Sequence, residues 1–281
     1  MPGTPSGPNE EGNTMTTPTG RDFAVVTGAS SGIGYELARQ FAENGFDLLL
    51  AAEDEGITQA AADLRRDGVN DVQAVQVDLA TYDGVEELYA AIRAAGRPVD
   101  AIAINAGRGI GGDFTRQTDL SDELNVIDLN VRSTVHLAKR VLPDLVSRGA
   151  GRVLFTSSIA STMPGTYQAV YNASKSFVQS FAEALRNELK DTGVTVTSLM
   201  PGPTDTNFFD RAEMEDTKVG ASKKDDPAQV AEQGFKALMK GEEKVVAGSL
   251  KTKVQGAASK VMPDSVKAQM HRKMAEPGSA E

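Results

Sequence analysis

A glycine-rich turn near the start of the chain restricts the fold strongly, because a predicted strand leads into it and a predicted helix follows it. Residues 23–26 form a short apolar run with the character of a buried strand, and residues 35–44 carry apolar side chains at helical spacing. The turn between them reads Thr27-Gly28-Ala29-Ser30-Ser31-Gly32-Ile33-Gly34. Its glycines allow a sharp turn close to a ligand, and the helix start offers free N–H groups to a pyrophosphate. The spacing predicts a dinucleotide-binding unit, with a plain tight turn as the alternative.

The rest of the chain repeats this alternation of strand and helix. Further strands are predicted at residues 48–52, 72–77, 99–104, 152–156, 194–199 and 244–247. Strands that alternate with helices build βαβ units. We therefore expect an α/β fold of the Rossmann type, a doubly wound, mainly parallel seven-stranded sheet with helices on both faces. Ligands of such sheets bind at the carboxyl ends of the strands.

The expected domain covers residues 21–250, and segments of different composition flank it. Residues 1–20 are rich in Pro, Gly, Thr and Asn, which predicts a disordered N-terminal tail. Within the domain, the charged segment 207–226 predicts a flap over the substrate. Residues 251–281 are predicted to be a helical extension and tail, with Val254, Ala258, Val261 and Met262 at helical spacing among basic residues. Such a helix packs on a partner subunit or lies on an anionic membrane surface.

Composition excludes several classes of function. The 281 residues include no Cys, so thiolate nucleophiles and Cys-ligated metals are excluded. The two histidines, His136 and His271, are far apart and are interpreted as surface or packing residues, and no metal site is predicted. A net charge of −10 argues against a nucleic-acid partner. No apolar run is long enough for a membrane span and no secretory signal is visible, so a cytoplasmic protein is expected.

An acidic cluster follows the second predicted strand. Glu53, the first of three consecutive acids, lies 19 residues after Gly34. This is close to the spacing of about 20 residues expected for an acid that hydrogen-bonds an adenosine ribose. An exposed cluster at a helix start is the alternative.

Two polar features fall within predicted helices. Tyr171 and Lys175 are four residues apart, which brings the phenol and the ammonium to one helix face. A neighbouring cation lowers the pKa of a phenol and suits it to proton transfer, although an ordinary surface pair has the same spacing. Asn130 lies inside a long predicted helix, residues 122–147, where Asn is unfavourable. Either it faces solvent or it marks a local helix distortion with a function.

With these residues in view, the chain resembles the short-chain dehydrogenase/reductase family, in its compact single-domain branch, over residues 21–247. The motifs that match are ordered along the chain as in the family: the turn 27–34, Asn105-Ala106-Gly107, Asn130, Ser158, Tyr171-Asn172-Ala173-Ser174-Lys175, and the segment from Pro201-Gly202 to Thr206. Ser158 is preferred to Ser157 because it lies 13 residues before Tyr171, as the catalytic Ser of the family does.

The resemblance implies hydride transfer between a nicotinamide ring and a carbonyl or alcohol carbon of a small-molecule substrate. Tyr171 is expected to exchange a proton with the substrate oxygen, and Ser158 to stabilise that oxygen. Lys175 is expected to lower the pKa of Tyr171 and to bind the nicotinamide ribose. Asn130 is expected to hold a water that relays protons. A non-catalytic dinucleotide-binding sensor or scaffold is the main alternative, and a longer nucleotide-sugar epimerase or dehydratase is disfavoured.

The same resemblance predicts NAD(P) as the cofactor. NAD is favoured over NADP, because Ser31 and Glu53 stand where members that use NADP often carry basic residues. Asp78 is expected to contact the adenine. Family members also form homodimers or homotetramers through the helices that bear Asn130 and Tyr171. The predicted cofactor-binding residues are Gly28, Ser30, Ser31, Gly32, Ile33, Gly34, Glu53, Asp78, Leu79, Asn105, Ala106, Gly107, Tyr171, Lys175, Pro201, Gly202, Thr204 and Thr206.

Overall fold

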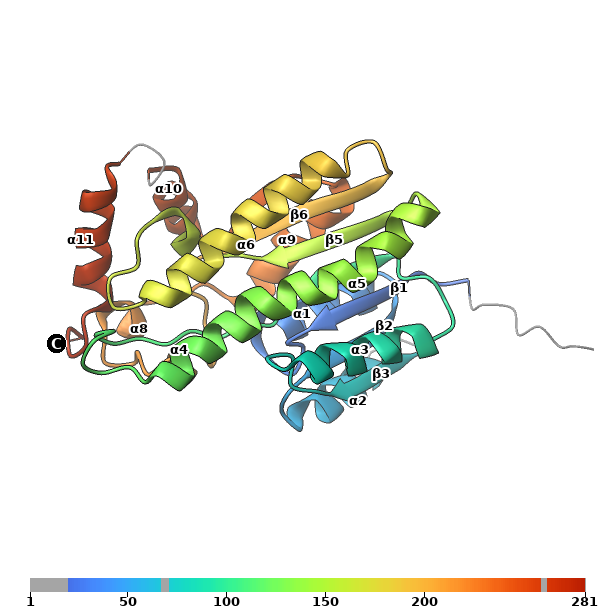
Figure 1. The fold of residues 1–281 in the computed structure, drawn as a ribbon, viewed down its shortest axis with the longest axis horizontal. Helices are drawn as coiled ribbons and strands as arrows, with labels where there is room; N and C mark the ends of the chain where they lie inside the picture. The colour runs from blue at the N-terminus through green and yellow to red at the C-terminus, as the bar shows by residue number, and fades with distance from the viewer. Residues whose placement is uncertain (1–19, 67–70, 259–261, 281) are drawn as a thin grey trace, which may run out of the picture.

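A computed structural model describes residues 20–66, 71–258 and 262–280, so nearly all of the predicted N-terminal tail, and Val261, lie outside the described residues. The described chain contains one parallel seven-stranded sheet with the strand order β3-β2-β1-β4-β5-β6-β7 (Figure 1). The predicted α/β fold is therefore confirmed. The strands are β1 (Phe23–Thr27), β2 (Asp47–Ala52), β3 (Val72–Gln76), β4 (Ala101–Ile104), β5 (Gly151–Thr156), β6 (Val194–Pro201) and β7 (Lys244–Ala247).

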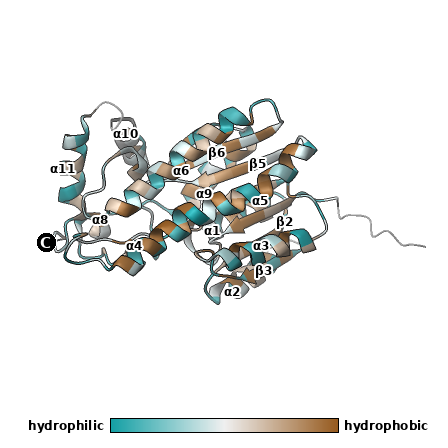
Figure 2. Ribbon diagram, in the orientation of Figure 1, coloured by the Kyte–Doolittle hydropathy of each residue, from teal (hydrophilic) through white to brown (hydrophobic). Residues whose placement is uncertain are grey.

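Helices cover both faces of the sheet, which explains why the central strands are continuously apolar. Every residue of β1, β2 and β4 is buried. Figure 2 shows apolar strands between helices that carry polar residues on their outer faces. One core cluster joins the sheet to α1 (Gly32–Glu43), α2 (Gly56–Arg66) and α9 (Pro227–Lys240). The other joins it to α3 (Tyr82–Ala94), α5 (Ser133–Arg148) and α6 (Ala169–Glu188).

The long helix predicted at residues 122–147 is interrupted by one wide turn. It begins as α4 (Leu120–Ile127), passes through a π-helical segment at Asp128–Arg132, and continues as α5. Asn130 lies in the middle of that segment and is 1% exposed. The local distortion is therefore confirmed, and the solvent-facing alternative is wrong.

The remaining helices lie near the carboxyl ends of the strands (Figure 1). They are α7 (Phe208–Arg211) and α8 (Lys218–Ala221) in the flap, followed after β7 by α10 (Leu250–Ala258) and α11 (Asp264–Ala275); a short 3-10 turn, Ile159–Thr162, follows β5. Among the helices of the described ranges, none is long and apolar enough to cross a lipid bilayer.

The strand order places a crevice at one end of the sheet. The chain runs outward from β1 to β2 and β3, and then returns to the other side of β1 as β4. Helices that cross on opposite faces at such a point leave an opening at the carboxyl ends of the two strands. The predicted glycine-rich turn follows β1 at this opening.

Candidate active site

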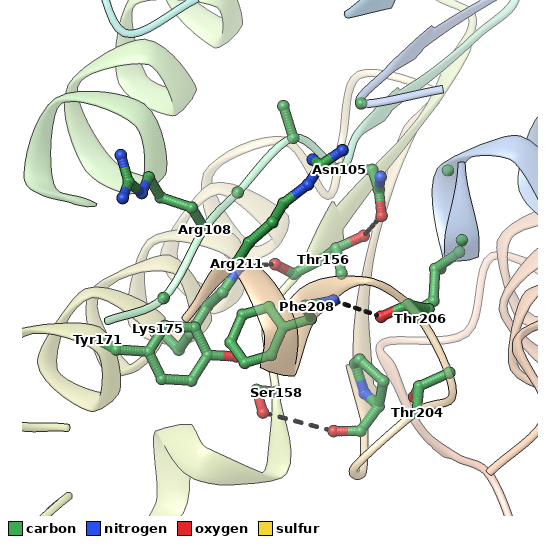
Figure 3. Close-up of a pocket in the computed structure, with 18 of the residues that line it drawn as sticks. Asn105, Arg108, Thr156, Ser158, Tyr171, Lys175, Thr204, Thr206, Phe208 and Arg211 are labelled. Atoms are coloured by element: carbon green, nitrogen blue, oxygen red, sulfur yellow. Dashed lines mark hydrogen bonds between the residues drawn. The ribbon is translucent and has the colours of Figure 1, made fainter. Parts of the chain in front are cut away.

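A cleft at the carboxyl ends of the strands brings together most of the predicted residues. Figure 3 shows part of its lining, with Tyr171 and Lys175 on one side and Thr206 on the other. The wall comes from the glycine-rich turn, the carboxyl ends of β2 to β6, the start of α6, the flap and α11. The predicted residues that line it are Gly28, Ser30, Ser31, Gly32, Ile33, Gly34, Glu53, Leu79, Asn105, Ala106, Gly107, Ser158, Tyr171, Lys175, Pro201, Gly202, Thr204 and Thr206.

The glycine-rich turn has no room for side chains at its glycine positions. Gly28 and Gly32 have φ values of +66° and +57°, which favour glycine. A Cβ atom on Gly34 would lie 1.9 Å from the carbonyl oxygen of Gly28, and one on Gly32 would lie 2.8 Å from Cγ2 of Thr206. The N-cap of α1, Ser31, makes no side-chain capping bond, so the first N–H groups of that helix face the cleft uncapped. These features fit the pyrophosphate of a dinucleotide.

Asn105 joins three strands beside this turn. Its Nδ2 donates to the Thr27 carbonyl at 3.0 Å, and its Oδ1 accepts from the Thr156 hydroxyl at 2.9 Å. Its backbone N–H donates to Oγ1 of Thr27 at 2.9 Å. The side chain therefore fixes the ends of β1, β4 and β5 relative to one another.

Two of the three acids after β2 have different surroundings. The Asp54 carboxylate accepts hydrogen bonds from the Ser30 hydroxyl at 2.7 Å and from the Gly56 N–H at 3.0 Å, and it lies 3.9 Å from the Arg211 guanidinium. Glu53 is exposed and lines the cleft beside it. Asp54 thus accepts a bond from the start of α2, while Glu53 lines the cleft and its contact with the ribose stays a prediction.

Asp78 lies at the edge of the predicted site, and its contact with the adenine stays a prediction. Its neighbours Val77 and Leu79 line the cleft, but Asp78 does not. Its carboxylate instead accepts a hydrogen bond from the Ala80 N–H at 2.9 Å, in the turn before α3. Successive side chains of extended backbone point to opposite sides, and Asp78 is exposed between two buried residues.

Ser158 and Tyr171 meet on one wall of the cleft (Figure 3). Tyr171 lies in the first turn of α6 and is 9% exposed. Ser158 follows β5, and its hydroxyl accepts a hydrogen bond from the Ala160 N–H at 3.1 Å. The hydroxyl of Ser157 donates to the carbonyl oxygen of Lys175 at 3.0 Å, within the protein. The two serines therefore differ in role, and Ser158 is the one beside the phenol.

Burial dominates the pKa values of the Tyr–Lys pair. Burial raises the pKa of Tyr171 to about 12, against the weaker opposite effect of a hydrogen bond with Ser158. Burial also lowers the pKa of Lys175 to about 8. The Lys175 Nζ donates to the Thr156 carbonyl at 3.0 Å and lies 6.0 Å from the centre of the Tyr171 ring. The pKa of Tyr171 is therefore raised overall, and the expectation that Lys175 opposes this rise stays a prediction.

Asn130 lies behind the wall rather than in it. Its Oδ1 accepts from the Arg108 N–H at 2.9 Å, and its Nδ2 donates to the Arg108 carbonyl and to the Ser174 hydroxyl, each at 2.9 Å. A Cβ atom on Gly107 would lie 3.0 Å from this Oδ1 and 3.1 Å from Nζ of Lys175. The amide therefore fixes the loop after β4 close to Lys175.

Several residues that complete the cleft had no individual role in the prediction, although Phe208 and Arg211 lie in the predicted flap 207–226. From the flap, the Phe208 ring packs against the Tyr171 ring with 5.2 Å between their centres, and Arg211 faces Asp54. Gln168, His271 and Met274 also line the cleft. His271 is buried, which agrees with its interpretation as a packing residue. Its position in the wall of the cleft was not expected.

Fold and cleft together define a dinucleotide-binding α/β protein with a buried Tyr, Ser and Lys beside the predicted cofactor site. Comparison with known proteins identifies the family to which it belongs. A model of the short chain dehydrogenase family matches residues 22–217, and the chain belongs to this family. It is an oxidoreductase that acts on alcohol or carbonyl groups with NAD(P).

Two relatives and one solved structure illustrate the similarity. The chain is 35% identical over 194 residues to "Sulfoacetaldehyde reductase 2" of Chromohalobacter salexigens, with 66% of this chain and 74% of the relative covered. It is 32% identical over 180 residues to "NADP-dependent 3-hydroxy acid dehydrogenase YdfG" of Salmonella typhi, with 64% and 71% covered. A short-chain dehydrogenase from Sphingobium yanoikuyae in complex with NADPH superposes with a TM-score of 0.74 and 29% identity, over 80% of this chain and 87% of that one.

Proposed function

We propose that this enzyme reduces a small-molecule aldehyde or ketone, with Tyr171 as the proton donor. The observation that carries the proposal is the meeting of the Tyr171 phenol with Ser158, beside buried Lys175, on the wall of the cleft that begins at the glycine-rich turn. The nicotinamide cofactor supplies the hydride to the carbonyl carbon. The protein supplies the position of the substrate oxygen and its proton.

Each of the three side chains has a role suited to its surroundings. The raised pKa keeps the Tyr171 phenol protonated near neutral pH, so it has a proton to donate to the developing alkoxide. The Ser158 hydroxyl donates a hydrogen bond to the same oxygen. Lys175, still largely protonated at pH 7, offers donors to the ribose hydroxyls and stabilises the negative charge that Tyr171 acquires. Reduction is the direction that a protonated phenol favours.

Asn130 acts as a positioning residue in this proposal. Its amide is already engaged by the Arg108 backbone and by Ser174. We keep the proton-relaying water as a proposal, supported by the wide turn that surrounds Asn130 in the helix.

We further propose that NAD is preferred to NADP. Glu53 and Asp54 both line the cleft at the end of β2, and carboxylates attract a ribose 2′-hydroxyl but repel a 2′-phosphate. Arg211 is the cation nearest to Asp54 among the ion pairs of the described residues, and it faces that carboxylate. Steady-state kinetics with NADH and NADPH test this, and a strong preference for NADPH that is lost in Arg211→Ala would assign Arg211 to the 2′-phosphate instead.

A homodimer or homotetramer through α4, α5 and α6 is also proposed. The outer side of α4 exposes Leu120, Leu124 and Ile127, which are 72%, 49% and 40% exposed, and α6 exposes Phe177 at 40%. Apolar side chains grouped in this way are typical of a contact surface. Light scattering after size exclusion should give a multiple of the 29.7 kDa chain mass for the wild type, and a smaller species for Leu124→Glu.

A spectrophotometric screen tests the proposed reaction. Aldehydes and ketones are mixed with NADH or NADPH, and the absorbance of the reduced cofactor is followed. Consumption that depends on the enzyme and on the carbonyl compound supports the proposal. Tight cofactor binding without turnover of any compound would favour the sensor or scaffold instead.

A further inference from the structure

The segment from α11 to the end of the described chain closes one side of the cleft, although it lies beyond the part that the family model matches. In Figure 1, α11 stands beside α8 and the loop that leads into α6. The Thr166 hydroxyl donates to the Ala268 carbonyl at 3.0 Å. The Tyr167 hydroxyl accepts from Arg272 at 2.9 Å and donates to Glu276 at 3.2 Å.

The same segment is hydrogen-bonded to the flap, residues 207–226. The N–H groups of Gly278 and Ala280 donate to the side chain and the backbone carbonyl of Asp216, at 2.7 and 2.9 Å. Ala275 is 1% exposed and belongs to a small core with Phe209, Ala212 and Met214. The segment is thus held from two sides, and its position next to the cleft follows from packing.

His271 brings a hydrogen-bond acceptor to this wall. It is 6% exposed, lines the cleft, and has its Nδ1 at 2.9 Å from the Thr166 carbonyl oxygen. A carbonyl only accepts, so Nδ1 carries the proton. Burial lowers the pKa of the imidazole below its ordinary value, so the ring is neutral at pH 7 and Nε2 has a free lone pair. No residue of the described ranges donates a hydrogen bond to Nε2.

Gln168 brings an unpaired amide group to the same cleft. It lies two residues after Thr166 and three before Tyr171, and it is 7% exposed. Its Nε2 is buried and has no hydrogen-bond partner among the described residues. A buried amide without a partner is costly, and native proteins tolerate such groups mainly where a ligand or water pairs with them.

Apolar side chains also line the cleft, and Arg108, one of the cations in its lining, is engaged within the protein. Met163, Phe208 and Met274 line the cleft with these two side chains. Arg108 is bonded to Asn125 and pairs with Asp122 at 3.3 Å. A negatively charged substrate group would therefore not find a free cation in Arg108, whereas a neutral group that both donates and accepts suits the donor of Gln168 and the acceptor of His271.

We propose that Gln168 and His271 form a second polar contact in the substrate pocket, and that the substrate is a mainly apolar aldehyde or ketone with a hydroxyl group away from the reacting carbon. The Gln168 amide donates to the hydroxyl oxygen, and Nε2 of His271 accepts its proton in a hydrogen bond. This inference rests on the proposed function, because it takes the cleft as the place where a carbonyl compound binds.

The test uses methyl ketones of increasing length that end in a hydroxyl group. Each is paired with the ketone that ends in a methyl group instead, and with the one that ends in a carboxylate. Binding is measured by calorimetry in the presence of reduced cofactor on Tyr171→Phe, which removes turnover but leaves the second contact in place. At one chain length we expect the hydroxyl ketone to bind about tenfold more tightly than the methyl ketone and the carboxylate ketone of the same length.

Two substitutions in the Tyr171→Phe background connect that preference to the proposed residues. Gln168→Leu and His271→Phe should each reduce the preference to about threefold or less, with little change for the methyl compound. Gln59→Leu and His136→Phe, the same replacements outside the cleft, should leave it unchanged. Gln168→Glu keeps the shape and removes the donor, so it replaces Gln168→Leu if that variant does not fold.

The outcomes separate this inference from the proposed reaction. No preference at any chain length, a preference for the carboxylate, or a preference that survives both substitutions would overturn the second contact. Turnover of the same compounds by the wild-type enzyme is measured separately. A binding preference without any turnover would leave the second contact standing and refute the proposed reaction.

Discussion

Replacing Lys175 by Met should make the protein more stable while it removes activity. The ammonium is 5% exposed, and burial lowers its pKa from 10.5 to about 8. A difference of about 2.5 units corresponds to about 3 kcal/mol that the folded state loses by carrying the charge. Met fills similar volume without that cost. Loss of the hydrogen bond to the Thr156 carbonyl offsets about 1 kcal/mol of the gain.

The effect has a characteristic dependence on pH. Below pH 8 the folded and unfolded chains both carry the charge, so the wild type bears the full cost. Between pH 8 and 10.5 the folded chain has released the proton while the unfolded chain still holds it. The wild type therefore gains stability from this group as the pH rises through that window, and the advantage of the variant shrinks.

Urea denaturation followed by circular dichroism measures both effects. At pH 7 we expect Lys175→Met to unfold with a free energy about 2 kcal/mol higher than the wild type, with a smaller difference at pH 9.5. Lys139→Met, at an exposed position of α5, is the matched control and should change stability little. A Lys175→Met variant that is less stable at pH 7, or a gap that does not shrink with pH, would refute the reasoning.

Three further substitutions test other parts of the site. Ser158→Ala should lower kcat about 10²- to 10³-fold with little change in cofactor affinity, as measured by steady-state kinetics and cofactor fluorescence, because one donor to the substrate oxygen is lost. Gly34→Ala should weaken cofactor binding and lower the melting temperature, since its Cβ would lie 1.9 Å from the Gly28 carbonyl oxygen; normal cofactor affinity would contradict the structure of the turn. Asn130→Ala leaves the N–H and carbonyl of Arg108 without their partner and should cost about 2 kcal/mol in urea denaturation, with a lower kcat; an unchanged free energy would show that those bonds contribute little.

Local patterns in the sequence were enough to predict the framework. The helix predicted at residues 35–44 corresponds to α1, Gly32–Glu43, which begins three residues earlier in the glycine-rich turn. The strand at 244–247 likewise matches β7. Asn130 indicated the helix distortion because its residue type is unfavourable in a regular helix. Each of these signals depends on neighbours in the chain, so a sequence shows them directly.

Properties of the site that depend on distant contacts were not predictable in this way. His271 meets Thr166 across 105 positions of the chain, and no spacing indicates that contact. The pKa of Tyr171 depends on how completely the fold buries the phenol, which the i,i+4 spacing to Lys175 does not show. The hydrogen bond that the Asp78 carboxylate accepts from the Ala80 N–H was likewise not indicated by the motif position.

Tyr171→Phe tests the central claim most directly, because it removes one oxygen and keeps the ring against Phe208. With a carbonyl compound that the wild type reduces, kcat should fall at least about 10³-fold, while the dissociation constant of the reduced cofactor changes less than about threefold. Retention of wild-type turnover by Tyr171→Phe would contradict the assignment of Tyr171 as the proton donor.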